Sequence, residues 1–182
     1  EIPLRLVGSE MCIRDRGNYA HGNQPIQHML YMYNYSGQPW KAQHWIREVM
    51  DKLYTPAPDG YCGDEDNGQT SAWYVFSSMG FYPVCPGTDE YILGTPYFKQ
   101  MKLHLENGKT ITISAPENGD DKRYISSMTL NGKEHTKNYL THEELMNGAS
   151  ITFKMAAQPN EQRGTKEADL PYSFSNEFKK KK

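Results

Sequence analysis

Three carboxylates stand side by side in the segment from Gly63 to Ser71, which reads GDEDNGQTS. Asp64, Glu65 and Asp66 directly precede a stretch with helical spacing, so the sequence places them at a helix N-terminus. Helix capping and the positive end of the helix dipole explain one carboxylate there, and a purely structural cap is one interpretation. Neighbouring carboxylates repel one another unless a cation or a substrate proton relieves the repulsion, and the cluster therefore also indicates chemistry.

Two kinds of chemistry compete for this carboxylate cluster. The pattern Asp-x-Asp-x-Gly opens a calcium loop of the EF-hand type, but the twelfth position counted from Asp64 is Val75 instead of the required Glu. An inverting glycosidase uses one carboxylate to activate water and a second carboxyl group, about 6.5 to 9.5 Å away, as the acid. The sequence therefore favours a general base for carbohydrate hydrolysis within this cluster over a calcium loop.

A second polar cluster, His21-Gly22-Asn23-Gln24-Pro25, precedes the first expected helix. Its His, Asn and Gln side chains can hydrogen-bond sugar hydroxyls, and amide oxygens are suitable ligands for calcium. Helix capping by Asn23 and a packed or exposed imidazole are the structural alternatives. In a barrel of helical hairpins, loops that precede helices can gather at one end, and we expect the two clusters to meet there.

Helical spacing dominates residues 17–80. Pro25 suits a first helical turn and Gly37 is placed to end that helix, after which Pro39 opens a second one. Two prolines at positions 56 and 58 break the second helix. A third helix is expected from Gln69 to Met79, with a buried face made of Ala72, Trp73, Phe76 and Met79.

Beyond Pro83 the apolar residues alternate, which predicts strands. Asn107-Gly108 and Asn131-Gly132 each separate two alternating runs and predict two β-hairpins. The segment 141–144, Thr-His-Glu-Glu, matches a capping box and predicts one short helical turn. A closing strand is expected at 150–155, and the polar chain beyond it is expected to be loose.

Composition narrows the class of protein. The 182 residues carry a formal net charge of −2 and are 37% hydrophobic and 23% charged, which is typical of a folded domain rather than a disordered chain. Four lysines at 179–182 have no basic face to accompany them, so nucleic-acid binding is set aside. The 3 cysteines lack paired spacing, which argues against a disulfide framework or a zinc site. No apolar run approaches the roughly 20 residues that span a bilayer, and no membrane insertion is expected.

Residues 1–16, EIPLRLVGSEMCIRDR, have neither a helical nor a strand period over a useful length. They also lack the apolar region of a signal peptide. The stretch resembles translated sequencing-adapter read-through, so we interpret it as a non-native segment and expect the native sequence to be entered in mid-domain near Gly17.

Residues 17–157 resemble glycoside hydrolase family 92, the calcium-dependent exo-α-mannosidases. Three long segments carry the resemblance: Gly17 to Gln43, Gly60 to Gly87 and Tyr91 to Lys109. The family pairs an N-terminal β-sandwich with an (α/α)6 barrel that ends in a β-rich appendage. The fold class expected for this chain is therefore α+β: the C-terminal part of an (α/α)6 helical barrel (17–89), a small antiparallel β-sandwich-like subdomain (90–157) and a polar tail (158–182).

The resemblance also implies a mechanism and a cofactor. Family members invert the anomeric configuration, with a Glu as general acid and an Asp pair as the base machinery, and Asp64 and Asp66 fall on the base motif. Calcium in the family contacts the 2- and 3-hydroxyls of the terminal mannose and helps to distort the ring. Asn23 and Gln24 fall in the segment that resembles the metal-binding region, and we expect them to hold Ca2+.

His21 and Gln69 are the expected substrate-binding residues. Many relatives have a Glu where this chain has Gln24, and the difference removes a formal charge from the expected calcium site. Members specific for α-1,2 links tend to carry His-Glu at the positions of His21 and Gly22. Because Gly22 stands here, α-1,2 specificity is not assigned to this chain.

In the family the general acid lies upstream of the matched segment, so the isolated chain is expected to be inactive. The implied substrate is a mannose-containing glycan, as in N-glycan degradation, and the implied location is periplasmic or secreted. The absent helices are expected to leave Trp45 and Trp73 without part of their packing partners. A non-catalytic carbohydrate-binding module and another (α/α)6 glycosidase are the alternative interpretations.

Overall fold

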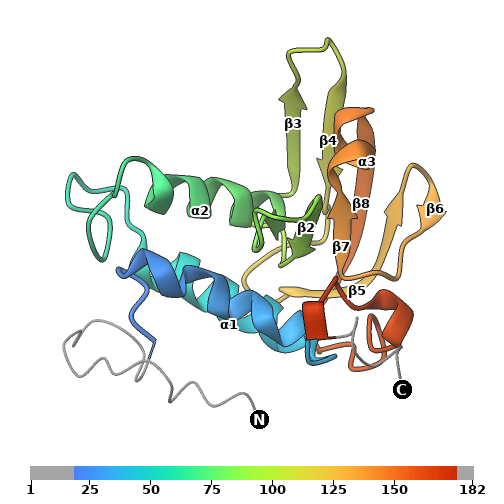
Figure 1. Ribbon diagram of the computed structural model, residues 1–182, viewed down its shortest axis with the longest axis horizontal. Coiled ribbons are helices and arrows are strands. Elements are labelled where there is room, and N and C mark those ends of the chain that lie inside the picture. The colour runs from blue at the N-terminus through green and yellow to red at the C-terminus, as the bar shows by residue number, and fades with distance from the viewer. Residues whose placement is uncertain (1–18, 176–182) are drawn as a thin grey trace.

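The computed structural model describes residues 19–175, which form an α+β chain with helices at one end and two sheets at the other (Figure 1). The helical part contains the 3-10 helix η2 (Gln24–Asn34) and the α-helices α1 (Pro39–Leu53) and α2 (Gln69–Met79). The remaining elements are β1 (Phe81–Tyr82), β2 (Glu90–Leu93), β3 (Gln100–His104), β4 (Thr110–Ser114), β5 (Tyr124–Leu130), β6 (Lys133–Glu134), β7 (Tyr139–Thr141), α3 (His142–Met146), β8 (Ala149–Ala156) and η3 (Glu167–Asp169). Within the described range, no helix is long and apolar enough to cross a membrane.

Proline and glycine set the helix limits where the sequence placed them. Pro25 lies in the first turn of η2, and Pro39 is the first residue of α1. Gly80, at φ 96°, ends α2 and donates its backbone N–H to the carbonyls of Phe76 and Ser77. The three predicted helices are thus confirmed, although the first has 3-10 geometry.

The buried face of α2 differs from the predicted one. Trp73 and Met79 are buried as expected, but Ala72 is exposed and Phe76 is only half-buried. Thr70 and Ser77 take their places, because polar groups can be buried when they are hydrogen-bonded. Ser77 Oγ lies 2.7 Å from the hydroxyl of Tyr31 on η2. The apolar pattern alone therefore misplaces this helix face.

Two sheets form the β-rich part, with strand orders β1-β2-β7 and β3-β4-β8-β5-β6. Both predicted hairpins are confirmed, since β3 pairs with β4 around Asn107-Gly108 and β5 pairs with β6 around Asn131-Gly132. The capping box at Thr141 and Glu144 is also confirmed at the start of α3. The expectation of wholly antiparallel strands is wrong, because β4 and β8 pair in parallel. The long stretch between them, which holds β5, β6, β7 and α3, supplies the crossover that a parallel pair requires.

Two hydrophobic cores lie on either side of β2. Ile92 packs with the helical core around Tyr31, Ile46 and Trp73, whereas its neighbour Leu93 packs with the core between the sheets. Successive side chains of a strand point to opposite faces, so one short strand joins both cores. Trp73 is 0% exposed, so the expectation that it is left without part of its packing partners is wrong, whereas Trp45 is half-buried.

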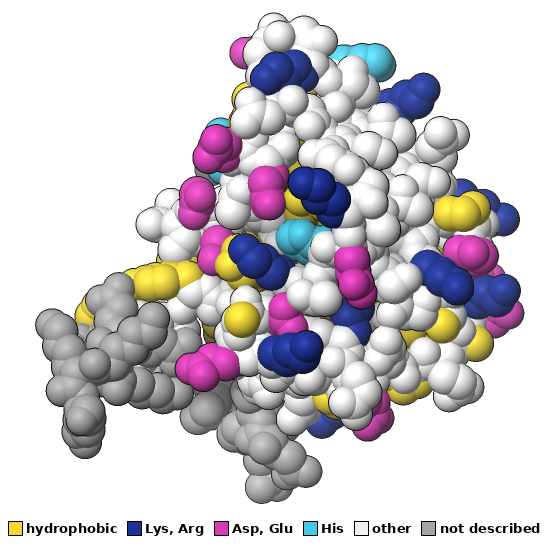
Figure 2. Space-filling view, turned by 90° about the vertical axis from the view of Figure 1, so that its right-hand side faces the viewer, with side chains coloured by type: hydrophobic (Ala, Val, Ile, Leu, Met, Phe, Trp, Pro, Cys, Tyr) yellow, Lys and Arg dark blue, Asp and Glu magenta, His cyan; other side chains and the backbone are white. Residues whose placement is uncertain are grey.

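Residues 157–175, which follow β8, pack against the β-rich part instead of being loose. Arg163 is 8% exposed and donates to the carbonyls of His135 and Lys137 at 3.0 and 3.2 Å. Burial lowers the pKa of this guanidinium to about 10. On the face of the β-rich part that Figure 2 shows, acidic and basic side chains are interspersed.

Candidate active site

The two polar clusters singled out in the sequence meet at the N-terminal ends of η2 and α2. Gln24 Nε2 donates to the backbone carbonyl of Asp64 at 2.6 Å, across 40 positions of the chain. Thr70, in the first turn of α2, donates its hydroxyl to the same carbonyl at 3.0 Å. The prediction that the loops before these two helices come together is confirmed.

Two glycines allow the loops to cross backbone to backbone. A Cβ atom on Gly63 would lie 2.5 Å from the carbonyl oxygen of Gly22. A Cβ atom on Gly22 would in turn lie 2.6 Å from the carbonyl oxygen of Cys62. Contacts this short involve backbone on both sides, so a side chain at either position forces the loops apart.

Gly63→Ala is therefore expected to lower the free energy of unfolding of the chain by about 1–3 kcal/mol, the usual cost of overpacking. Gly87→Ala is the matched control, because a Cβ atom there meets nothing within 4 Å. Urea unfolding followed by circular dichroism measures both variants. Equal midpoints for the two variants would contradict the close crossing of the loops.

The three carboxylates have different surroundings. Asp64 and Asp66 are exposed, whereas Glu65 is half-buried and accepts a hydrogen bond from the backbone N–H of Ser71 at 3.2 Å. Asp66, Asn67 and Gly68 adopt left-handed conformations in succession, with φ of 47°, 57° and 97°. Such conformations cost energy in residues other than glycine, and they cluster at functional sites. Glu65 thus contacts the first turn of α2, while both candidate bases are left accessible.

His21 is 0% exposed beneath the two loops. Its Nδ1 lies 2.8 Å from the hydroxyl of Tyr19 and its Nε2 lies 2.7 Å from the hydroxyl of Tyr54. Because Tyr54 donates its own hydrogen to the carbonyl of Thr70, the proton of the imidazole belongs on Nε2. Burial lowers the pKa of His21 to about 3, so the ring is neutral near pH 7. A direct contact between His21 and a sugar would require one of these hydrogen bonds to break.

The other predicted ligands are exposed to different degrees. Asn23 is the N-cap residue of η2 and is exposed, and its side chain makes no capping hydrogen bond within the described chain. Gln69, the first residue of α2, is also exposed, whereas Gln24 is 8% exposed. Capping by Asn23, the structural alternative considered from the sequence, is therefore not observed.

The oxygen atoms near the crossed loops are of the kinds that calcium binds. Calcium takes about 6–8 oxygen ligands, from carboxylates, amides, backbone carbonyls and water. Asn23 and Gln24 supply amide oxygens, and Asp64 and Asp66 supply carboxylates. Over residues 19–175 no group of three or more His, Cys, Asp and Glu side chains could hold a metal ion.

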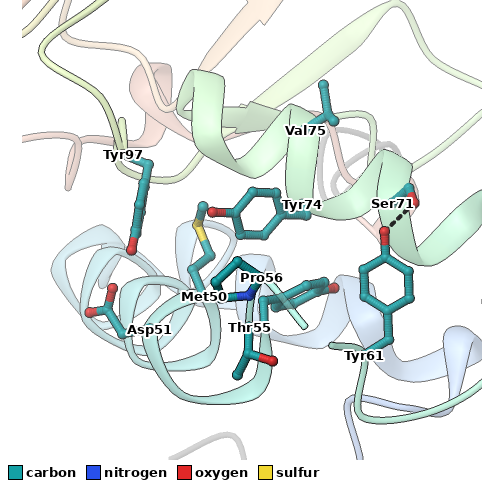
Figure 3. Close-up of a pocket in the computed structure, with 10 residues that line it drawn as sticks. Met50, Asp51, Thr55, Pro56, Tyr61, Ser71, Tyr74, Val75 and Tyr97 are labelled. Carbon is teal, nitrogen blue, oxygen red and sulfur yellow. Dashed lines mark hydrogen bonds between the residues drawn. The ribbon is translucent and has the colours of Figure 1, made fainter. Parts of the chain in front are cut away.

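A cavity of about 560 Å³ lies between the end of α1 and α2, beside the loop that carries Asp64 (Figure 3). Its lining combines the aromatic rings of Tyr54, Tyr61, Tyr74 and Tyr97 with the carboxylate of Asp51. Tyr61 and Ser71 are joined by a hydrogen bond of 2.7 Å between their hydroxyls. This lining was missed in the sequence, where the only signal was the high count of 13 Tyr residues.

Comparisons with known proteins agree on one family. The model of the glycosyl hydrolase family 92 catalytic domain matches residues 5–157. The structure of the family GH92 inverting mannosidase BT2199 from Bacteroides thetaiotaomicron VPI-5482 matches with a TM-score of 0.83 and 60% identity, over 87% of this chain and 22% of that one. The family GH92 α-mannosidase BT3965 from the same species, solved in complex with mannoimidazole, matches with a TM-score of 0.85 and 39% identity, over 87% and 21%.

A curated relative is more distant. It is an uncharacterized secreted glycosidase from Arthroderma benhamiae, 29% identical over 97% of this chain and 24% of its own length. The chain thus spans roughly a quarter or less of the proteins that it matches. Because the family model covers most of the sequence, the chain belongs to glycosyl hydrolase family 92, as a part of its catalytic domain.

Proposed function

We propose that this chain supplies the base side of the active site of an inverting, exo-acting α-mannosidase. The observation that carries the proposal is the crossing of the two polar loops at the starts of η2 and α2, where Gln24 holds the carbonyl of Asp64. Family membership and the likeness to two mannosidase structures support the same reading. In this proposal residues 17–89 belong to the end of an (α/α)6 barrel, and residues 90–157 form the β-rich C-terminal subdomain.

Asp64 or Asp66 takes a proton from water in this mechanism, and the water attacks the anomeric carbon of the terminal mannose. Both carboxylates are exposed, which gives a water molecule and a sugar access to them. A carboxylic acid from a segment upstream of this chain protonates the leaving oxygen on the opposite side of the sugar ring. The carboxyl groups of an inverting pair stand about 6.5–9.5 Å apart, which leaves room for the water.

Calcium belongs to the proposal as a cofactor of the complete protein. Asn23 and Gln24 would hold the ion through their amide oxygens, together with ligands from other segments of the complete protein. A bound calcium ion supplies positive charge that binds and orients sugar hydroxyls. The proton transfer to Asp64 or Asp66 does not involve the ion.

The proposed substrate is a mannose-containing glycan, including the N-glycans from which terminal α-mannosides are removed. The proposed substrate-binding residues are Gln69, which is exposed at the start of α2, and His21, which is buried. The proposed location is periplasmic or secreted, in line with the curated relative that is called a secreted glycosidase.

A segment exchange tests this proposal. In the grafted enzyme, residues 19–171 of this chain replace the matching segment of the BT2199 mannosidase. We expect the grafted enzyme to hydrolyse an aryl α-mannoside and to leave an aryl glucoside intact. Proton NMR of the released mannose should show inversion of the anomeric configuration. The isolated 182-residue chain is expected to give no turnover, since the proposed mechanism takes its acid from an upstream segment. Turnover by the isolated chain at rates like those of the grafted enzyme would contradict the proposal.

The alternative of a non-catalytic carbohydrate-binding module gives a different result. Such a module binds mannosides equally well after Asp64→Asn or Asp66→Asn and contributes nothing to hydrolysis. An exchange of the segment that leaves the host inactive, together with sugar binding by the isolated chain, would favour it.

A further inference from the structure

The carbonyl oxygen of Asp64 accepts hydrogen bonds from two side chains on different elements. Gln24 Nε2 at the start of η2 donates at 2.6 Å, and Thr70 Oγ1 in α2 donates at 3.0 Å. We infer that Gln24 is a positioning residue, which holds the backbone of Asp64 through its side-chain amide. The inference rests on the proposed function, because it concerns the geometry of the base side of that active site.

Only one orientation of the Gln24 amide is compatible with its surroundings. A carbonyl oxygen can only accept, so the nitrogen of the amide must face Asp64. The hydroxyl of Thr70 gives its hydrogen to the same carbonyl, and its oxygen is then free to accept from Gln24 Nε2 at 3.3 Å. A Glu at position 24 has no hydrogen to give when ionised and would place a carboxylate oxygen against the carbonyl of Asp64.

The hydrogen bond from Gln24 to Asp64 is partly buried, and it acts on the backbone of Asp64 instead of its side chain. Gln24 is 8% exposed and Thr70 is 0% exposed, whereas the side chain of Asp64 is exposed. Removing the Gln24 donor leaves the carbonyl of Asp64 with the Thr70 hydroxyl as its side-chain partner, so the loop loses one of the two side-chain hydrogen bonds to this carbonyl. We call the hydrogen bond from Gln24 Nε2 to the carbonyl of Asp64 the clamp. The clamp therefore holds the backbone of Asp64 in place and leaves its carboxylate exposed.

The close approach of Gly22 and Gly63 allows the hydrogen bond between Gln24 and Asp64 to form. Gly22 and Gly63 bring the two backbones into direct contact, and this places Gln24 within reach of the carbonyl next to Gly63. A catalytic carboxylate that shifts by about 1 Å can cost up to roughly 100-fold in rate. Loss of the clamp is thus expected to act mainly on kcat, because substrate binding does not depend on the exact position of the base.

Gln24→Glu in the grafted enzyme tests the inference, with Gln100→Glu on the exposed edge strand β3 as the matched control. We expect Gln24→Glu to lower kcat by about 10- to 100-fold, with KM within about threefold of the parent. The control keeps both values. Gln24→Met, which removes the donor without adding charge, is expected to lower kcat in the same way and serves as the second variant if Gln24→Glu does not fold.

Calcium distinguishes positioning through Gln24 Nε2 from the proposed ligand role of the amide oxygen of Gln24, because Gln24→Glu removes the donor and keeps an oxygen ligand. A carboxylate is a better ligand for calcium than an amide, so a residue acting through the ion keeps or gains activity in Gln24→Glu at saturating calcium. The clamp predicts that added calcium does not restore kcat in this variant. Restored kcat, or a kcat within about threefold of the parent in both Gln24→Glu and Gln24→Met, would overturn the inference.

Hydrogen exchange separates this inference from the proposed function. If the grafted enzyme is inactive with Gln24 intact, the proposed function fails, and the clamp is then judged in the 182-residue chain. The backbone amides of Gln69 and Thr70 bond to the carbonyls of Asp66 and Glu65, both at 3.3 Å. The exchange of these two amides is expected to accelerate at least about tenfold in Gln24→Glu, which corresponds to losing a hydrogen bond of about 1.4 kcal/mol. It is expected to stay unchanged in Gln100→Glu. Unchanged exchange in Gln24→Glu would refute the clamp.

Discussion

Asn in place of Asp64 or of Asp66 is expected to lower kcat of the grafted enzyme by about 100- to 10,000-fold, the contribution typical of a general base. The amide of Asn has nearly the shape of the carboxylate but does not accept the proton from water. Asn also tolerates the left-handed conformation that Asp66 adopts at φ 47°, so the loop keeps its course. KM is expected to change much less than kcat, because binding of the sugar does not require the proton transfer.

Comparison of the two variants identifies the base. The residue whose replacement has the larger effect on kcat and removes the acidic limb of the pH–rate profile is the one that activates water. Asp59→Asn is the control, because Asp59 is an exposed carboxylate a few residues upstream in the chain. If both Asp64→Asn and Asp66→Asn keep kcat within about threefold of the parent, the base side lies elsewhere in the enzyme.

Acid is expected to destabilise the chain through His21. Its pKa in the folded chain is about 3, below the ordinary value of 6.5, because burial disfavours the charged ring. The unfolded chain therefore binds a proton more readily, and the stabilisation from the neutral ring is complete above about pH 6.5 and decreases as the pH falls toward 3. Tyr19, Tyr54 and Trp73 surround the ring, and none of them supplies a negative charge in this range.

Urea unfolding at pH 7 and at pH 4.5 measures this effect. His21→Gln is expected to be less stable than the parent at pH 7 and to lose less of its stability on acidification, by about 2 kcal/mol. His28→Gln, at an exposed position of η2, should follow the parent at both values. Parallel loss of stability in the parent and in His21→Gln would show that His21 is not buried as a neutral ring.

The parts of the fold that were predicted correctly depend on interactions between residues close together in the sequence. The limits of α2 follow from the spacing of its apolar residues and from Gly80, and the hairpins follow from Asn107-Gly108 and Asn131-Gly132. These signals act within a few residues and need no knowledge of distant contacts. The capping box at Thr141 is of the same kind.

The errors arise where the partner lies far away in the sequence. Ser77 is buried because its hydroxyl forms a hydrogen bond with the hydroxyl of Tyr31, 46 positions earlier. No local sequence pattern predicts that contact. The chain beyond residue 157 was expected to be loose because it is polar, yet Arg163 is buried against carbonyls of 135 and 137. At the candidate site, the types of residue were visible in the sequence, whereas the roles of Gln24 and His21 depend on contacts with Asp64 and Tyr54.

The position of β2 between the two cores limits how segments of this protein can be exchanged between relatives. A crossover between residues 89 and 90 would take β1 from one parent and its partner strand β2 from another. It would also pack Ile92 against helical-core residues from the other parent, whereas Leu93 would keep the sheet-core residues that follow it in the sequence. Recombination libraries should therefore inherit residues 19–171 as one block, with crossover points outside it.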